Sequence, residues 1–77
     1  MRSFTIRSPQ GKERFFDSEA KRNDFLFQAL FDGADMTNVR AFNDGEEVSL
    51  LSIGASNYDR DPDLPISEDF WEWEKTH

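Results

Sequence analysis

The chain has 77 residues, 36% of them apolar, with a formal net charge of −7 and no cysteine. A chain of this length supports one small hydrophobic core, and without cysteine it has neither disulfides nor a thiolate for catalysis or metal binding. No stretch approaches the roughly 18 apolar residues of a membrane span, and the first ten residues lack the apolar run of a signal peptide. We therefore expect a soluble, cytoplasmic protein.

The acidic charge is concentrated in the second half of the chain. Residues 1–40 hold seven basic and six acidic residues, whereas residues 41–77 hold two basic and ten acidic residues. A negative surface repels DNA, RNA and anionic membranes, so we expect none of these to bind directly. The asymmetry predicts instead a partner with a Lys/Arg-rich surface.

The first 16 residues have the pattern of a β-hairpin. Phe4 and Ile6 alternate with polar residues over 2–8, which predicts a strand with one buried face. Pro9 and Gly11 suit a tight turn, and residues 12–16 can return as a second strand.

The pattern over residues 18–32 is that of an α-helix. Asp17 or Ser18 can serve as the N-cap, Glu19 lies in the first turn, and Gly33 follows at the usual place of a left-handed C-terminal cap. Helical spacing gathers several residues on one face, which we expect to face the core: Ala20, Asn23, Phe27, Leu30 and Phe31. Phe25 points to nearly the opposite side, so we expect another part of the chain to cover it.

Residues 39–50 predict a second hairpin. Apolar and polar positions alternate on either side of Asp44-Gly45, a favoured two-residue turn. The alternation changes phase at residues 50–53, which indicates either a β-bulge or a strand covered on both faces. The predicted fold is therefore α+β, with the order β-β-α-β-β and one helix packed on one face of a small antiparallel sheet.

After Gly54 the composition becomes acidic and aromatic. Residues 55–65 are polar and contain two prolines, as in a linker or an extended arm. Helical features return near the end of the chain, where Ser67 can cap a helix and Ile66 can pack on Trp71. We expect residues 1–54 to form a compact domain and residues 55–77 an acidic, aromatic arm that packs on the same core and ends in a short helix.

The sequence offers little for catalysis or metal binding. The sole histidine is His77, and neither a nucleophile–base pair nor a Gly-rich phosphate loop is present. Aspartates alternate at 59, 61 and 63 as in a calcium loop, but the sixth and twelfth positions of such a loop, which need Gly and Glu, hold Leu64 and Phe70. We expect a protein that is not an enzyme and binds no cofactor or metal.

The acidic residues of the arm have the spacing of a polyanion. In an extended segment Asp59, Asp61 and Asp63 would form a row about 6.5 to 7 Å apart, and helical spacing would extend it at Glu68 and Glu72. Basic grooves that bind a nucleic-acid backbone would accept such a row as a decoy. The ordinary alternative is a solvated acidic tail that keeps the protein in solution.

Aromatic residues stand among these acids at the end of the arm. A tail that serves only solvation has no use for Phe70, Trp71 and Trp73. Either the chain buries these rings against itself, or an exposed tryptophan anchors a basic partner by cation–π contact. The residues that we assign to partner binding are Asp44, Glu46, Glu47, Asp59, Asp61, Asp63, Glu68, Asp69, Trp71, Glu72, Trp73 and Glu74.

In its size, lack of cysteine and concentrated negative charge, the chain resembles the small acidic inhibitors that bacteriophages encode, such as anti-CRISPR proteins and other nucleic-acid mimics. The resemblance covers composition and no signature residues. It implies a non-catalytic inhibitor that occludes the basic nucleic-acid-binding surface of a larger complex in the host cytoplasm. An alternative of a different class is a homo-oligomerising or scaffold module, in which Phe25, Phe42 and the tryptophans form a hydrophobic interface and a homodimer results.

Overall fold

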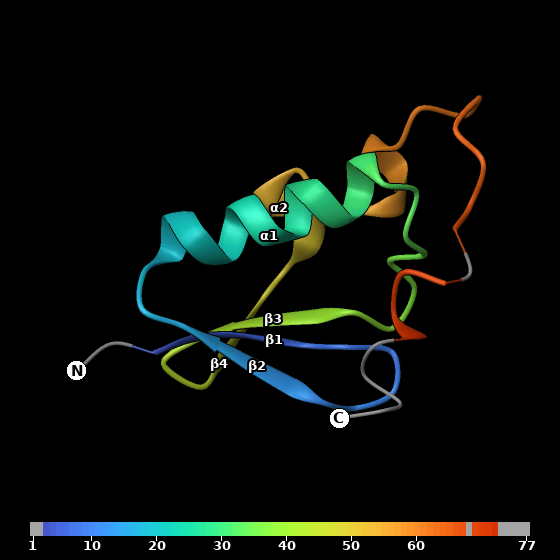
Figure 1. The fold of residues 1–77 in the computed structure, drawn as a ribbon. Coiled ribbons are helices and arrows are strands. Elements are labelled where there is room, and N and C mark those ends of the chain that lie inside the picture. Colours follow the sequence, from blue (N-terminus) through green and yellow to red (C-terminus); the bar gives the residue numbers. More distant parts are fainter. Residues whose placement is uncertain (1–2, 68, 73–77) are drawn as a thin grey trace.

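The computed structural model describes residues 3–67 and 69–72 of the chain. Its elements in chain order are β1 (Phe4–Arg7), β2 (Glu13–Phe16), α1 (Glu19–Phe31), β3 (Arg40–Asn43), β4 (Glu46–Val48), α2 (Leu50–Ile53) and the 3-10 helix η1 (Asn57–Asp59). The strands form one antiparallel sheet in the order β2-β1-β3-β4, and α1 lies across one face of it (Figure 1). The predicted α+β class is confirmed.

The second hairpin has the predicted turn, but the chain after β4 differs from the prediction. Asp44 and Gly45 both have positive φ, 52° and 88°, as a two-residue hairpin turn requires. Neither a bulge nor a longer strand follows β4. The Ser49 hydroxyl instead accepts the Leu51 N–H at 3.2 Å and caps α2, which ends at the left-handed Gly54. The change of phase at residues 50–53 is therefore the start of a helical turn.

The ends of α1 are as predicted, whereas the predicted core face is correct at Leu30 and wrong at Phe31. The Ser18 hydroxyl accepts the Lys21 N–H at 3.1 Å, and Gly33 follows the helix with φ of +86°. The buried residues of α1 are Arg22, Leu26, Ala29 and Leu30, while Phe31 is 73% exposed. This face also has helical spacing, but its first residue is charged, so a search for apolar positions overlooks it.

The core lies between α1 and the sheet. Ile6 of β1, Ala41 of β3 and Leu26 of α1 are fully buried there. Arg22 is only 1% exposed, and its Nη1 donates hydrogen bonds to the backbone oxygen of Phe42 (3.0 Å) and to the side chain of Asn43 (2.8 Å). Loss of water on burial lowers the pKa of Arg22. These bonds fasten α1 to β3.

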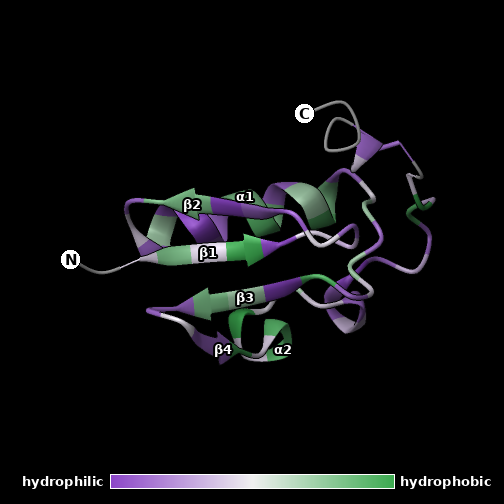
Figure 2. Cartoon of the chain, turned by 90° about the horizontal axis from the view of Figure 1, so that it is seen from below, coloured by the Kyte–Doolittle hydropathy of each residue, from purple (hydrophilic) through white to green (hydrophobic). Residues whose placement is uncertain are grey.

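No element among the described residues covers the opposite face of the sheet. The strand register sets Thr5 between Phe15 and Phe42, and sets Arg7 between Glu13 and Arg40. Figure 2 looks onto this face, and none of the described elements lies in front of the strands. We call it the open face.

The residues after Ala55 run from α2 past the C-terminal end of α1 and return towards the β1–β2 turn (Figure 1). We call residues 55–67 and 69–72 the arm. Ser67 does not cap a helix as predicted, because it forms an isolated parallel bridge with Ala34. Residues 69–71 form a turn, Glu72 has 3-10 conformation, and residues 73–77 of the predicted terminal helix lie outside the described residues.

The arm covers Phe25 of α1, as predicted. The Phe25 ring lies 6.2 Å from the Phe70 ring and 6.4 Å from the Trp71 ring, and Phe16 of β2 approaches it from the sheet at 5.6 Å. Trp71 belongs to the core cluster. Among residues 3–67 and 69–72, no helix is both long and apolar enough to cross a bilayer.

Candidate functional site

The arm is fixed to the segment that follows α1. The carbonyl of Gly33 accepts the Ser67 N–H at 2.7 Å and the Arg60 Nη1–H at 3.1 Å. A side chain at Gly33 would meet the chain itself, since an added Cβ would lie 2.5 Å from the carbonyl oxygen of Pro65. Glycine is thus required here for close approach as well as for its positive φ.

Arg60 is the basic residue of the arm, and it faces inward. Besides the Nη1 bond to Gly33, its Nε and Nη2 atoms are buried and have no hydrogen-bond partner among the described residues. The guanidinium is therefore directed beneath the arm, where it does not meet the outer carboxylates in an ion pair. The negative charge of the arm consequently dominates its outer surface.

Four aspartates of the arm are exposed and have no ion pair with a described cation: Asp59, Asp61, Asp63 and Asp69. Asp59 accepts the backbone N–H and the hydroxyl of Ser56, both at 3.0 Å, and Asp61 accepts the Asp63 N–H at 2.9 Å. These donors are neutral, so they orient the carboxylates without cancelling their charge.

The predicted straight row of aspartates is wrong. Asp59 ends η1, and a turn follows in which the Leu64 N–H bonds to the Asp61 carbonyl at 3.0 Å. Local side-chain hydrogen bonds of Ser56 and Asp61 favour these turns over an extended strand. The carboxylates therefore lie along a short segment that turns, not in a straight row.

The other acids assigned to partner binding lie elsewhere. Asp44, Glu46 and Glu47 belong to the β3–β4 hairpin, whose turn is at the opposite end of the molecule from the arm in both Figure 1 and Figure 2. Glu47 pairs with Arg40 at 2.7 Å, and the Asp44 carboxylate accepts the Ser3 N–H at 2.7 Å. The predicted residues therefore form two separate groups. In the hairpin group Glu47 is neutralised by Arg40, whereas Asp44 and Glu46, like the four aspartates of the arm, have no ion pair with a described cation.

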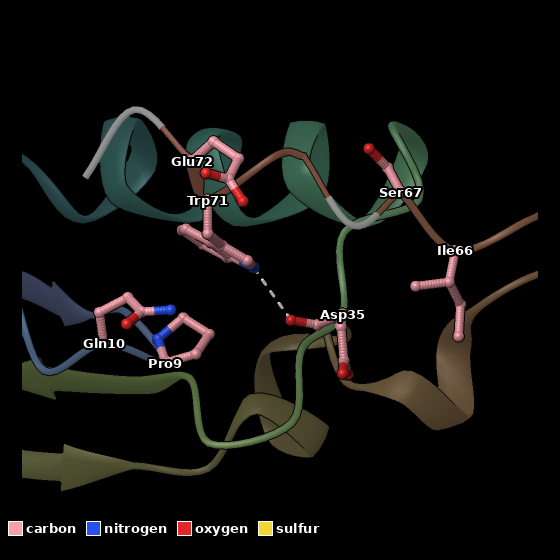
Figure 3. Close-up of a pocket in the computed structure, with 7 residues that line it drawn as sticks. All are labelled: Pro9, Gln10, Asp35, Ile66, Ser67, Trp71 and Glu72. Atoms are coloured by element: carbon pink, nitrogen blue, oxygen red, sulfur yellow. Dashed lines mark hydrogen bonds between the residues drawn. The ribbon is translucent and has the colours of Figure 1, made fainter. Parts of the chain in front are cut away.

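A groove of about 390 Å³ separates the arm from the β1–β2 turn (Figure 3). Its lining combines apolar surface with two carboxylates and consists of Pro9, Gln10, Asp35, Ile66, Ser67, Trp71 and Glu72. Ile66 is 60% exposed. Apolar walls with carboxylates beside them suit the aliphatic stem and cationic end of a lysine or arginine side chain.

Asp35 remains ionised in this groove. Its carboxylate accepts the Thr37 N–H at 2.9 Å, and hydrogen bonds from Thr37 are the main cause that lowers the pKa of Asp35. A lowered pKa favours a fixed negative charge over proton transfer at neutral pH. Asp35 is suited to attract a cation.

Trp71 is not the exposed anchor that one of our alternatives requires. It is only 6% exposed, its Nε1–H donates to the backbone oxygen of Asp35 at 3.0 Å, and its ring meets Phe70 edge-on at 4.8 Å. The alternative in which the chain buries its own ring is thus confirmed for Trp71. Trp73, Glu68 and Glu74 lie outside the described residues.

A second hollow of about 390 Å³ lies between the end of α1 and the start of the arm. It is lined by Leu30, Phe31, Asp59, Arg60, Asp61 and Leu64. The exposed ring of Phe31 stands here beside two of the uncompensated aspartates. An apolar surface and negative charge thus meet at a second place on the arm.

Sequence reasoning missed several of these residues. Asp35 and Phe31 were not assigned to binding, and the inward direction of Arg60 has no signature in sequence. Asp35 did leave a signal in the sequence. An aspartate side chain often accepts the backbone N–H of the residue two positions later and so forms an Asx turn, as Asp35 does with Thr37.

The described residues contain no histidine or cysteine, and none of their carboxylates gather in a group of three or more that could hold a metal ion. The arrangement offers a negative, partly apolar surface for binding. Comparison of the chain with protein-family models, with curated proteins and with solved structures finds no match.

Proposed function

We propose that this is a non-catalytic binding protein whose arm docks on a Lys/Arg-rich surface of a larger complex and blocks that surface for nucleic acid. The observation that carries the proposal is the set of four exposed aspartates, Asp59, Asp61, Asp63 and Asp69, none of which pairs with a described cation. A phosphate backbone presents the same kind of charge to the same kind of surface.

Charge is expected to govern how fast the complex forms. The chain carries a net charge of −7, and an acidic patch steers a basic partner towards itself over about a Debye length, roughly 8 to 10 Å at physiological salt. Hydrogen bonds already hold the Asp59 and Asp61 carboxylates in place. Binding therefore costs less side-chain conformational entropy than it would if the same carboxylates stood on a flexible tail.

Apolar contacts are expected to govern how long the complex lasts. The groove beside Asp35 and the hollow beside Phe31 give a partner's lysine or arginine stems a place to pack next to carboxylates. An arginine over the exposed Phe31 ring would add a cation–π contact. Such contacts slow dissociation more than they speed association.

The test compares two triple variants that remove equal charge at opposite ends of the molecule. The arm variant is Asp59→Asn, Asp61→Asn, Asp63→Asn, and the hairpin variant is Asp44→Asn, Glu46→Gln, Glu47→Gln. Each immobilised protein captures partners from a cell lysate at two salt concentrations, with mass-spectrometric readout, and an arginine-rich synthetic peptide serves as a quantitative probe.

We expect the arm variant to bind the peptide roughly tenfold or more weakly than the unmodified chain, because it has lost the steering charge. The hairpin variant should stay close to the unmodified chain. Captured proteins should carry Lys/Arg-rich surfaces and be released by added nucleic acid and by salt. Equal losses in both variants, or captured proteins that nucleic acid fails to release, would refute the proposal.

A further inference from the structure

The open face is the second surface that this structure leaves unexplained. Phe15 of β2 is 69% exposed there, and Phe42 of β3 lies on the other side of Thr5 in the same row. A shallow hollow of about 200 Å³ runs between them. An antiparallel sheet often leaves one face in water, but that face is ordinarily polar, so two large rings on the open face indicate an interaction surface.

We propose that the open face is the interface through which two copies of this chain form a dimer. The charges on this face favour a second copy of the chain over a basic partner. The four charged residues that the described strands place on this face form two ion pairs, Arg7 with Glu13 at 3.0 Å and Arg40 with Glu47 at 2.7 Å, so their charges cancel. A basic partner gains nothing there, whereas a second copy can approach it without facing uncompensated charge.

The ion pairs also make the face complementary to itself. Each pair presents a positive and a negative end, so a copy related by a two-fold axis can set its arginines against the glutamates of the first. The Arg7 guanidinium already lies over the Phe42 ring, 5.0 Å from its centroid. The aromatic residues supply apolar area, and the ion pairs border it, as in the core and rim of an interface.

The area of the face predicts a weak dimer. Strands about 4.8 Å apart, with a rise of about 3.3 Å per residue, give this sheet a footprint of roughly 15 by 13 Å. Stable complexes bury about 800 Å² on each partner, which is considerably more. We therefore expect association at concentrations of about 100 µM rather than in the nanomolar range.

This dimer is independent of the proposed function because it uses another surface and responds to salt in the opposite direction. Salt screens the repulsion between two chains of charge −7 and should strengthen the dimer. The same salt should weaken binding of a basic partner to the arm. Failure of one proposal can therefore be distinguished from failure of the other.

The experiment is analytical sedimentation of the full chain at low and moderate salt. Protein concentrations run from about 10 to 500 µM, which brackets the expected dissociation constant of about 100 µM. Phe15→Glu places a charge in the centre of the interface, and Phe31→Glu is the control, because Phe31 is equally exposed but belongs to the end of α1. We expect Phe15→Glu to reduce the association constant roughly tenfold or more and the control to leave it within about threefold.

A second measurement uses the unmodified chain and does not depend on how a variant folds. Amide NMR shifts should change with protein concentration at Thr5, Phe15 and Phe42 and remain constant along the arm. A monomer throughout the concentration range, shift changes confined to the arm, or equal losses in the two variants would overturn the proposal.

Discussion

Replacing Gly33 with alanine tests whether the arm is part of the folded unit. Alanine at φ of +86° costs about 1 kcal/mol for the left-handed backbone, whatever surrounds it. The new Cβ would also meet the Pro65 carbonyl oxygen at 2.5 Å, a backbone atom that cannot move aside without displacing the arm. Displacement would break the hydrogen bonds from Ser67 and Arg60 to Gly33, which together contribute about 2 kcal/mol. We expect a total loss of about 3 kcal/mol in the free energy of unfolding.

Gly54→Ala is the matched control. Gly54 also follows a helix and also has φ of +86°, but nothing lies within 4 Å of an added Cβ. Gly54→Ala should therefore lower the free energy of unfolding by only about 1 kcal/mol, the cost of placing alanine in the left-handed backbone region. Urea unfolding followed by circular dichroism would give both free energies, and tryptophan fluorescence would report the surroundings of Trp71. If the two variants lose the same stability within about 0.5 kcal/mol, the close approach of the arm to Gly33 is refuted.

Three further predictions concern residues that connect the elements. Arg22→Met should lose about 2 kcal/mol of stability in urea unfolding, because the partly buried acceptors of Phe42 and Asn43 on β3 would be left without the arginine donor, and equal stability would contradict this role. Trp71→Phe keeps an aromatic ring but removes the N–H that bonds to Asp35, so a loss of about 1 kcal/mol is expected in the same assay, and no loss would show that the bond contributes nothing. In the folded protein the pKa of Asp35 lies below its ordinary value of 3.8. The Asp35 carboxylate therefore adds to the free energy of unfolding above pH 3.8, and this stabilisation is lost as the pH falls through the folded pKa. Asp35→Asn should therefore flatten the acid limb of the stability profile, and an unchanged limb would contradict this.

Local patterns predicted the parts of the fold that local interactions decide. The cap at Ser18, the turn at Asp44 and Gly45, and the left-handed residue after α1 depend on residues a few positions apart. The buried face of α1 was predicted wrongly because Arg22 is buried by acceptors that come from β3, about twenty residues away. Propensity and periodicity contain no information about such a partner.

The candidate site could be predicted in composition but not in arrangement. Counting charges correctly identified an acidic second half, yet it could not tell that Glu47 is neutralised by Arg40 across a hairpin while Asp61 and Asp63 keep their charge. Which acids remain uncompensated depends on where each cation points. Arg60 illustrates this, since it is three residues or fewer from Asp59, Asp61 and Asp63 and its Nη1 bonds to Gly33 instead.

The position of Trp71 connects the charge of the arm to the integrity of the fold. Because this ring belongs to the core and also lines the groove, the arm cannot be released without leaving a vacancy beside Phe25. A protease that cleaved the chain between η1 and Trp71 would therefore weaken the whole molecule as well as disperse its carboxylates. Selection on the acidic surface and selection on stability consequently act on the same few residues.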